Sequence, residues 1–317
     1  MLIEKNIDLD LTQLSGQTSQ PPWIFENNAF KDIVFVENKP VLFKVSQKDN
    51  FLDFNYEYPL NSDFNISDKV LLDKLNSIFD LNFNLGKFYS YLDNHEKLND
   101  MGGFCNGLRL FIAKNKFEAI LSSISSSNNS IARWTKSIQM LKEKWGLKIS
   151  YPSGEFYSFP DVNTINSCFE DDEEEFAYSD NILDIGNCNK NLKSCGFGYR
   201  STYLKKASEF FTLEMDLSDI SKMNYDEAFE TVQMIPGVGP KVADCLLLYG
   251  YNFREAFPTD VWIKRIVSHL FFDGKDISVP KVREFGMEEF GDYAGYVQLY
   301  LFHYARKSGL MVKLKNK

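Results

Sequence analysis

The chain has 317 residues, of which 44% are hydrophobic and 25% are charged, and its formal net charge at pH 7 is −9. Such a chain is long enough for two globular domains with a sizeable core. The acidic balance argues against a protein that binds nucleic acid over its whole surface. Six of the carboxylates stand together in the run "EDDEEEF" at 170–176, which is typical of a solvated segment.

Five cysteines are scattered along the chain, at 105, 168, 188, 195 and 245, and no C-x-x-C pair occurs. Their odd number and irregular spacing indicate reduced thiols in a cytoplasmic protein, with no disulfide framework and no zinc or iron–sulfur site. We therefore expect no metal and no cofactor. No apolar run is long enough to span a membrane, and the first residues, "MLIEKNIDLDL", carry carboxylates where a signal peptide has an apolar core.

The first hundred residues predict a small antiparallel sheet. Segments 33–38, 40–47 and 51–58 alternate or run apolar over strand lengths, and Asn and Asp clusters separate them. The apolar spacing becomes helical over 68–93, with Ser67 or the residue after it as the N-cap.

Beyond residue 99 apolar positions recur every three or four residues, which is typical of helices. Helices are predicted over 117–127, 131–146 (ending at Gly146), 199–215, 225–235, 242–250 (ending at Gly250) and 295–306, and 151–160 is expected to be a loop before a helix start. The fold class is therefore α+β. We expect an N-terminal antiparallel sheet domain over 1–98 and a mainly helical body over 99–317.

The stretch "MIPGVGPKVADC", residues 234–245, predicts a tight turn between two helices, within a helix–hairpin–helix at about 225–250. The first helix ends at or before Ile235, because a proline disfavours helical geometry at the residue before it. Gly237 and Gly239 give the turn its backbone freedom, and the next proline suits the first position of a helix. The helix amides attract a phosphate, and the turn carbonyls suit a monovalent cation that bridges to it. The hairpin thus favours a grip on a DNA backbone that reads no sequence.

Lys241 follows this turn directly, and Cys245 lies four residues further along the same helical face. The lysine is either a solvated cation, a phosphate contact or a nucleophile, and the last role needs a neutral amine. Asp260 in "FPTDVW" opens another helix and is by default its N-cap. A lysine and an aspartate that each open a helix beside one hairpin nevertheless form a specific pair.

Together, "IPGVGPKVADC" and "PTDVW" resemble the helix–hairpin–helix DNA glycosylases with a Gly/Pro-rich turn and an aspartate, and the lysine resembles that of their glycosylase/lyase branch. Four further segments resemble, in the same order, the 8-oxoguanine DNA glycosylases of the eukaryotic type, which also occur in some bacteria. These segments are "SSISSSNNSIAR" (122–133), "YPSGEFYSFP" (151–160), "CGFGYRSTYL" (195–204) and "AGYVQLYLF" (294–302). The matches run from about residue 14 to residue 306.

The resemblance implies a DNA repair enzyme that flips 8-oxoguanine out of duplex DNA, excises it and then nicks the strand. Lys241 would attack the sugar C1′, displace the base and form a Schiff base, from which β-elimination follows. Asp260 would stabilise the positive charge that develops on the sugar and help to position or deprotonate the lysine.

The resemblance also implies four DNA contacts. Asn128 would fill the gap left by the flipped base, because a short amide can hydrogen-bond the orphaned partner. Tyr199 would wedge into the base stack. Arg133 and Arg200 would read the opposite cytosine through its acceptors, since guanidinium forks suit planar acceptors.

The base pocket implied by the resemblance contains Gly16, Cys245, Gln298 and Phe302. 8-Oxoguanine carries a hydrogen on N7, where guanine has an acceptor, so the Gly16 carbonyl would accept from the lesion and repel guanine. Gln298 would read the Watson–Crick edge. Phe302 would stack on one side of the base and Cys245 would pack against the other.

The chain departs from this family pattern at three places. Trp23 is displaced relative to the family's tryptophan and follows two prolines; Trp262 replaces a phosphate-binding histidine; and Ala305 stands where the animal enzymes have an aspartate. The first departure affects the local alignment of Gly16, and the other two predict an altered backbone contact and pocket wall.

Two alternatives are a glycosylase for alkylated purines or adenine and a non-catalytic helix–hairpin–helix DNA-binding protein. Lys241 argues against the first, because those branches activate water, and no cysteine follows Cys245 to form a C-terminal four-cysteine cluster. The acidic net charge suits the second poorly. We therefore expect a monomer that acts on double-stranded DNA holding 8-oxoguanine opposite cytosine, with no membrane partner, and that is nucleoid-associated if bacterial.

Overall fold

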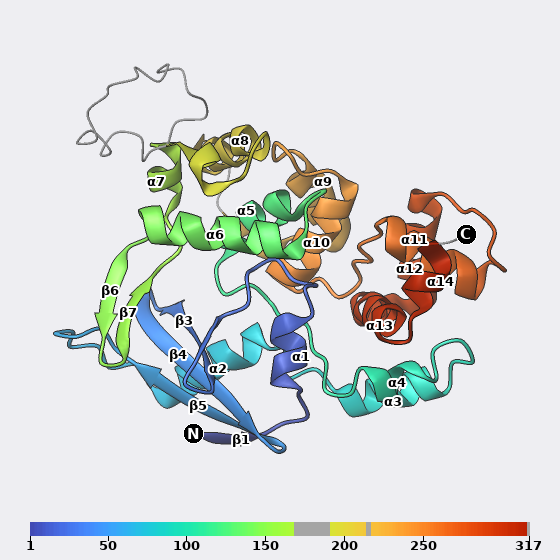
Figure 1. Ribbon diagram of the computed structural model, residues 1–317, viewed down its shortest axis with the longest axis horizontal. Coiled ribbons are helices and arrows are strands. Elements are labelled where there is room, and N and C mark those ends of the chain that lie inside the picture. The colour runs from blue at the N-terminus through green and yellow to red at the C-terminus, as the bar shows by residue number, and fades with distance from the viewer. Residues whose placement is uncertain (168–190, 214–216, 316–317) are drawn as a thin grey trace.

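The computed structural model describes residues 1–167, 191–213 and 217–315, and it has the predicted α+β architecture (Figure 1). The acidic run 170–176 and cysteines 168 and 188 lie outside the described residues. A five-stranded antiparallel sheet near the N-terminus adjoins a helical body that makes up most of the rest of the chain. No disulfide links the described cysteines, 105, 195 and 245.

The sheet has the strand order β1-β5-β4-β3-β2. Its strands are β1 (Leu2–Glu4), β2 (Ile24–Glu26), β3 (Ala29–Val36), β4 (Lys39–Lys48) and β5 (Phe51–Glu57). The three predicted strands are confirmed as β3, β4 and β5. Glu37 and Asn38 form the two-residue turn between β3 and β4, both with positive φ, which matches the twist of an antiparallel hairpin. The two edge strands of three residues were not predicted, because they are too short to show an alternation.

A second hairpin, β6 (Lys148–Tyr151) and β7 (Gly154–Tyr157), corrects the prediction of a loop at 151–160. Its apolar side chains pack on the face of the large sheet that turns away from the main sheet core, in a cluster of Ile33, Leu42, Ile149, Tyr151 and Phe156. Strands of four residues around a Pro-Ser-Gly turn resemble a loop in sequence. Only the packing against the sheet shows them to be strands.

The helices occupy most of the remaining chain. They are α1 (Leu9–Leu14), α2 (Asp68–Ile78), α3 (Leu85–Asp93), α4 (Met101–Phe104), α5 (Lys116–Ser126), α6 (Ile131–Trp145), α7 (Val162–Asn166), α8 (Arg200–Leu213), α9 (Tyr225–Gln233), α10 (Pro240–Tyr251), α11 (Val261–Phe271), α12 (Val279–Phe290), α13 (Ala294–Lys307) and α14 (Leu310–Lys315). Short 3-10 helices are η2 (Leu192–Cys195), η3 (Asp219–Lys222) and η4 (Gly291–Tyr293). Among the described residues, no helix combines the length and apolar character that a membrane crossing requires.

Three helix ends test the local predictions. Ser67 is the N-cap of α2, as predicted, and its side chain accepts from the Val70 amide. Helix α6 ends at Trp145 with Gly146 as C-cap, also as predicted. The predicted end of α10 at Gly250 is wrong: the helix runs to Tyr251, and Asn252 provides the left-handed cap. Gly250 instead permits close packing, because a Cβ there would lie 3.3 Å from the Ala119 Cβ on α5.

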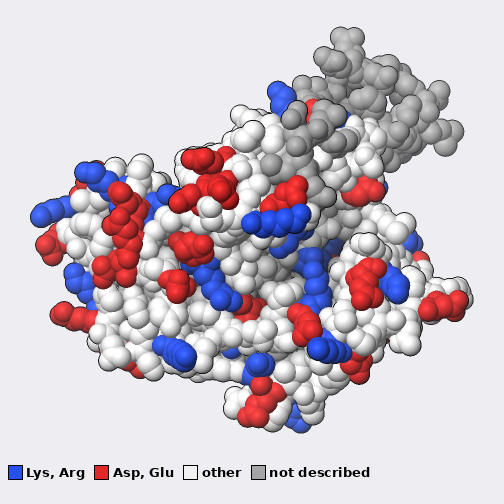
Figure 2. Space-filling view, turned by 180° about the vertical axis from the view of Figure 1, so that it is seen from behind, with Lys and Arg blue, Asp and Glu red and all other residues white. Residues whose placement is uncertain are grey.

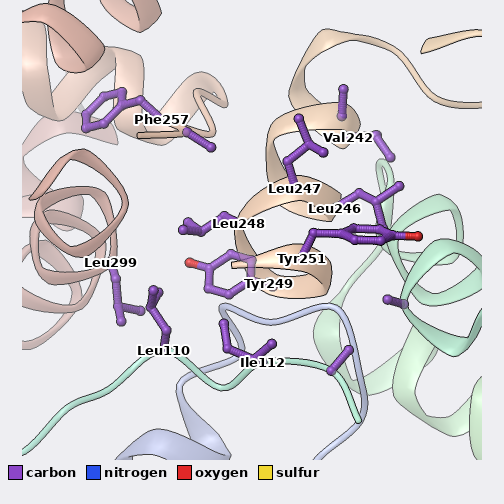
Figure 3. Packing of buried hydrophobic residues seen from close by; sticks show 14 of the residues in the cluster. Leu110, Ile112, Val242, Leu246, Leu247, Leu248, Tyr249, Tyr251, Phe257 and Leu299 are labelled. Atoms are coloured by element: carbon purple, nitrogen blue, oxygen red, sulfur yellow. The ribbon is translucent and has the colours of Figure 1, made fainter. Parts of the chain in front are cut away.

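Helix α10 lies at the centre of the helical core (Figure 3). Its side chains project to both sides, toward the 110–112 segment and α13 and toward α5. Only its first two residues and Cys245 escape full burial, so the open part of the helix is a short stripe that begins at the hairpin.

A buried charge cluster joins the sheet to the helical body. Asp32 on β3 receives hydrogen bonds from Lys142 of α6 at 2.9 and 3.1 Å, and Lys114 lies 2.9 Å from the same carboxylate. Lys114 also pairs with Glu118 of α5 at 2.7 Å. Burial works against the charged form of Asp32, but the two lysines outweigh it and lower the pKa of this carboxyl. The cluster therefore holds β3, α5 and α6 in one arrangement.

We predict that Asp32→Asn destabilises the protein by about 3–5 kcal/mol, because it leaves the buried Lys142 ammonium group without a carboxylate and leaves Lys114 with Glu118 alone. Urea unfolding followed by circular dichroism measures this loss. The matched control is Glu155→Gln, which breaks an ion pair with Lys148 whose side chains are half exposed, so water screens it and the midpoint should hardly move. Equal effects of the two substitutions would contradict the structural role of the buried cluster.

Candidate functional site

The open stripe of α10 faces a cavity of about 820 Å³. Five separate parts of the chain form its wall: the segment after α1, the α5–α6 turn, α10, the start of α11, and α13. The lining residues are Gly16, Gln17, Thr18, Ser126, Ser127, Asn128, Asn129, Ser130, Ile131, Arg133, Trp134, Lys241, Cys245, Tyr249, Asp260, Val261, Trp262 and Phe302. The cavity thus brings together seven of the twelve predicted site residues: Gly16, Asn128, Arg133, Lys241, Cys245, Asp260 and Phe302.

Lys241 and Cys245 are neighbours on the cavity wall, and both are half-buried. Their side chains are close enough for each to shift the pKa of the other. Burial raises the pKa of the Cys245 thiol, which is therefore neutral at pH 7. The Cys245 sulfur, as the anion that forms at the high pH where the amine titrates, raises the pKa of Lys241 more than the Asp260 carboxylate does, so the amine is protonated in the free protein at pH 7. Chemistry that needs a neutral amine must remove this proton first.

Asp260 has the N-cap role that is the default for its position. Its Oδ1 atom accepts from the backbone amides of Trp262 and Ile263 at 2.9 and 2.8 Å, at the start of α11. The same carboxylate interacts electrostatically with Lys241 across the cavity. The cap fixes the carboxylate at the cavity edge, where it is available to a positive charge.

Gly16 lies where the backbone conformation strongly favours glycine. Its φ of +73° is a conformation that other residues rarely adopt, and a Cβ would lie 2.3 Å from the Ile131 Cδ1 atom. Several hydrogen bonds tie the segment around it to the helical body. Arg306 donates to the Ser15 carbonyl at 3.0 Å, and the Ser19 hydroxyl donates to the Cys245 carbonyl at 3.2 Å.

Phe302 reaches the cavity directly, whereas Gln298 lies one layer behind its wall. Gln298 is 2% exposed. Its amide contacts two lining residues: the Tyr249 hydroxyl donates to Oε1 at 3.2 Å, and Nε2 donates to the Gln17 Oε1 atom at 3.3 Å. The predicted base-reading amide is therefore covered by Gln17 in this structure.

A second hollow, of about 520 Å³, adjoins the first one at Ser127. It contains the other predicted DNA contacts, Tyr199, Arg200, Gly237 and Gly239. Gly237 has φ +89°, and a Cβ there would lie 2.9 Å from the Cβ of Tyr203, whereas a Cβ on Gly239 would meet nothing within 4 Å. The hairpin is therefore closely packed against Tyr203 at Gly237. At Gly239 its backbone is open to an approaching group.

The turn between α5 and α6 separates the two hollows. Asn128 at its tip is exposed and has φ +48°, a left-handed conformation that asparagine tolerates. Arg200 is 8% exposed, and its guanidinium donates to the carbonyls of Ser127 and Asn128 at 2.7 to 2.9 Å. In this structure Arg200 thus supports the turn that presents Asn128, while the Arg133 side chain is exposed beside it.

The three departures from the family pattern have different positions. Trp23 is 2% exposed and packs edge-on against Phe43, Phe79 and Phe111 in the core of the sheet. Trp262 lines the cavity, and the Arg265 guanidinium lies 5.4 Å from its ring. Ala305 is fully buried and is not part of the cavity wall.

Two cavity residues of chemical interest were not predicted, Gln17 and Tyr249. Gln17 directly follows Gly16, and this adjacency was the signal that would have found it. Tyr249 gave no signal, because an aromatic residue within "LLLYG" is indistinguishable from a core residue in sequence.

The comparisons with known proteins agree along the whole chain. The family described as "HhH-GPD superfamily base excision DNA repair protein" matches residues 121–291, and "8-oxoguanine DNA glycosylase, N-terminal domain" matches residues 1–120. A probable N-glycosylase/DNA lyase of Methanothermobacter thermautotrophicus is 39% identical over 98% of this chain and 97% of its own length. The solved 8-oxoguanine glycosylase/lyase of Clostridium acetobutylicum, in complex with double-stranded DNA containing cytosine opposite 8-oxoG, is 28% identical. It has a TM-score of 0.77 over 96% of this chain and 93% of its own.

We predict that Cys245→Ala lowers the pKa of Lys241, because it removes the sulfur that contributes most to raising that pKa. The measurement is a carbon-13 NMR titration of the protein labelled at the lysine Cε. Lys241→Gln identifies the signal by deleting it. A titration midpoint that is the same with and without the Cys245 sulfur would contradict the assigned cause.

Proposed function

The chain belongs to the HhH-GPD superfamily of base excision DNA repair proteins, and from this premise we propose that it excises 8-oxoguanine paired with cytosine from duplex DNA through a Schiff base on Lys241. The resemblance that the motifs indicated is confirmed, and the chain is a DNA glycosylase with AP lyase activity, as its relatives are named. The lesion, the opposite base and the role of each residue are the proposed part.

One observation supports this proposal more strongly than the others do. The cavity places the Lys241 amine within electrostatic reach of the Asp260 carboxylate, at the end of a helix whose remaining surface is buried. An amine and a carboxylate at a cavity wall are the two groups that a lysine-dependent glycosylase needs. The cavity of about 820 Å³ is large enough for one flipped-out nucleoside.

In the first step the Lys241 ammonium gives one proton to solvent, and the nitrogen lone pair forms a bond to the sugar C1′. The bond from C1′ to the base nitrogen breaks, its electron pair leaves with the base, and the base takes up the second proton that the alkylated lysine nitrogen releases. Positive charge develops on the sugar during this exchange. Asp260 stabilises that charge because its carboxylate is held at the cavity edge by the α11 amides.

In the second step the sugar ring opens and the C1′–nitrogen bond becomes an imine. Loss of a proton from C2′ allows the electron pair to expel the 3′ phosphate, which nicks the strand. Water then hydrolyses the imine and releases the Lys241 amine. No metal or cofactor takes part in this sequence of bond changes.

The DNA approaches the two adjoining hollows. The hairpin at Gly237–Gly239 grips a phosphate, with a monovalent cation bridging its carbonyls to the DNA backbone. Asn128 enters the duplex where the base has left, Tyr199 wedges into the stack, and Arg133 reads the opposite cytosine with Arg200. Figure 2 shows one face of the molecule, on which carboxylates lie in several patches among lysines and arginines.

The lesion is recognised by one added hydrogen. The Gly16 carbonyl accepts from N7–H of 8-oxoguanine and faces a lone pair in guanine, so the normal base is repelled. Phe302 and Cys245, which both line the cavity, contact the two sides of the base.

We predict that sodium borohydride traps the wild-type protein covalently on a duplex with one 8-oxoguanine opposite cytosine, and that Lys241→Gln abolishes the adduct. Borohydride reduces the imine, so the trapped band requires the lysine nitrogen. The readout is denaturing gel electrophoresis, with an unmodified guanine duplex as the control substrate. A folded wild-type protein that binds this DNA and forms no adduct would instead favour a non-catalytic DNA-binding role.

We predict that Asp260→Asn slows 8-oxoguanine release by about a hundredfold or more, because the developing positive charge loses its carboxylate. Asparagine still caps α11, so the fold and the affinity for abasic-site DNA should stay within about threefold of wild type. Single-turnover base release measures the first quantity and fluorescence anisotropy the second. Base release at the wild-type rate would remove Asp260 from the mechanism.

A further inference from the structure

A chain of hydrogen bonds crosses the cavity wall from Tyr249 through Gln298 to Gln17. The Tyr249 hydroxyl donates to the Gln298 Oε1 atom at 3.2 Å, and the Gln298 Nε2 atom donates to the Gln17 Oε1 atom at 3.3 Å. Tyr249 and Gln298 are 1% and 2% exposed, whereas Gln17 is half-buried, and both Gln17 and Tyr249 line the cavity. This series of hydrogen bonds therefore ends at the Gln17 side chain, which contacts the cavity.

The Tyr249 hydroxyl determines which atoms donate and which accept in this series of hydrogen bonds. Burial raises the pKa of Tyr249 well above its usual value, so the hydroxyl keeps its proton and has a hydrogen to donate. Reversing the Gln298 amide would leave that hydrogen without the acceptor it has here. With the direction fixed, Gln17 uses its carbonyl oxygen for Gln298, and its two N–H donors are left for the cavity.

The backbone around Gln17 is fixed by hydrogen bonds on both sides, and its side-chain oxygen accepts from Gln298. The Gln17 amide donates to the Ser15 hydroxyl at 3.2 Å, and the Ser15 carbonyl is held by Arg306. On the other side, Thr18 donates to the Phe111 carbonyl at 2.9 Å. A donor on a fixed backbone at a cavity wall is a preorganised recognition group.

We propose that Gln17 is a further base-recognition residue, whose side-chain N–H donates to the O6 carbonyl of the excised purine, and that Tyr249 is a positioning residue that orients the two glutamines. This inference rests on the proposed function. Gly16, assigned to N7–H, directly precedes Gln17 in the wall, and Gln298 lies behind Gln17. On the rim of 8-oxoguanine O6 is next to N7, so a donor beside the Gly16 carbonyl faces O6.

At each of the two positions a hydrogen-bond donor on one partner faces an acceptor on the other. Gly16 offers an acceptor to a donor, and Gln17 offers a donor to an acceptor. A purine with an amino group at position 6 places a donor against the Gln17 N–H groups and loses this contact. Gln17 therefore selects for a 6-oxo purine, while Gly16 selects for the N7 hydrogen.

The test compares two substrates and two variants under single turnover. The substrates carry 8-oxoguanine or 2-amino-8-oxopurine, which lacks O6, each opposite cytosine. The variants are Gln17→Met, which is similar in size and has no polar hydrogen, and Gln139→Leu, which removes a glutamine amide on α6 that is not part of the cavity wall. We expect the wild type and Gln139→Leu to prefer the 6-oxo base about tenfold, and Gln17→Met to lose that preference.

Nicking of a pre-formed abasic site provides the second readout, because that substrate has no base to recognise. Gln17→Met should nick it within about threefold of the wild-type rate, which shows that the fold and Lys241 are intact. If Gln17→Met keeps the wild-type preference for the 6-oxo base, or slows abasic nicking as much as excision, the role of Gln17 is overturned. If the wild type excises neither base, the proposed lesion itself is wrong, and the two failures are thereby distinguished.

Tyr249→Phe tests the positioning role. Removing the hydroxyl frees the Gln298 amide to reverse, so the preference for the 6-oxo base should fall while abasic nicking is kept. An unchanged preference would show that Tyr249 does not orient the glutamines.

Discussion

The burial of α10 is the constraint on which the rest of the site depends. Apart from its first two residues and Cys245, this helix is enclosed by core side chains, so its position cannot change without loss of apolar contacts around most of its surface (Figure 3). Lys241 is consequently held by the whole helical core. The Asp244 carboxylate, one residue before Cys245, adds a polar anchor through Arg283 of α12 at 2.7 Å. The backbone of Lys241 therefore has a fixed position, although its side chain has four rotatable bonds.

The opposite wall of the cavity belongs to the segment after α1, which is far from α10 in sequence. Hydrogen bonds tie this segment to α10 and α13 through Ser19 and Arg306, and the Asp32 cluster joins the sheet to α5 and α6. Trp23, six residues after Gln17, packs in the core of the sheet, so the sheet helps to fix where Gly16 and Gln17 lie. The reacting groups therefore come from the helical body, whereas the groups proposed to contact the base come from both the helical body and the N-terminal part.

The predictions succeeded where a local rule was sufficient. The Pro and Gly positions in 234–245 are enough to fix the turn and the start of α10, and Ser67 is enough to fix the start of α2. The predictions failed where packing between distant segments determines the local structure. Strands β6 and β7 are too short to show a period, and Gly250 looked like a helix end although it serves a close contact with Ala119. Arg200 holds the turn below Asn128 in this structure, and its contact with the opposite cytosine stays a prediction.

The sequence by itself determined the fold class, the family and the pair formed by Lys241 and Asp260, because short motifs with fixed spacing encode turns, caps and the residue types that chemistry needs. Only the tertiary structure decided which groups share the cavity. It placed Gln298 behind Gln17, brought Tyr249 into the polar wall and separated Trp23 and Ala305 from the site. The physical reason is that motifs report local backbone geometry, whereas the composition of a cavity depends on how distant segments pack against one buried helix.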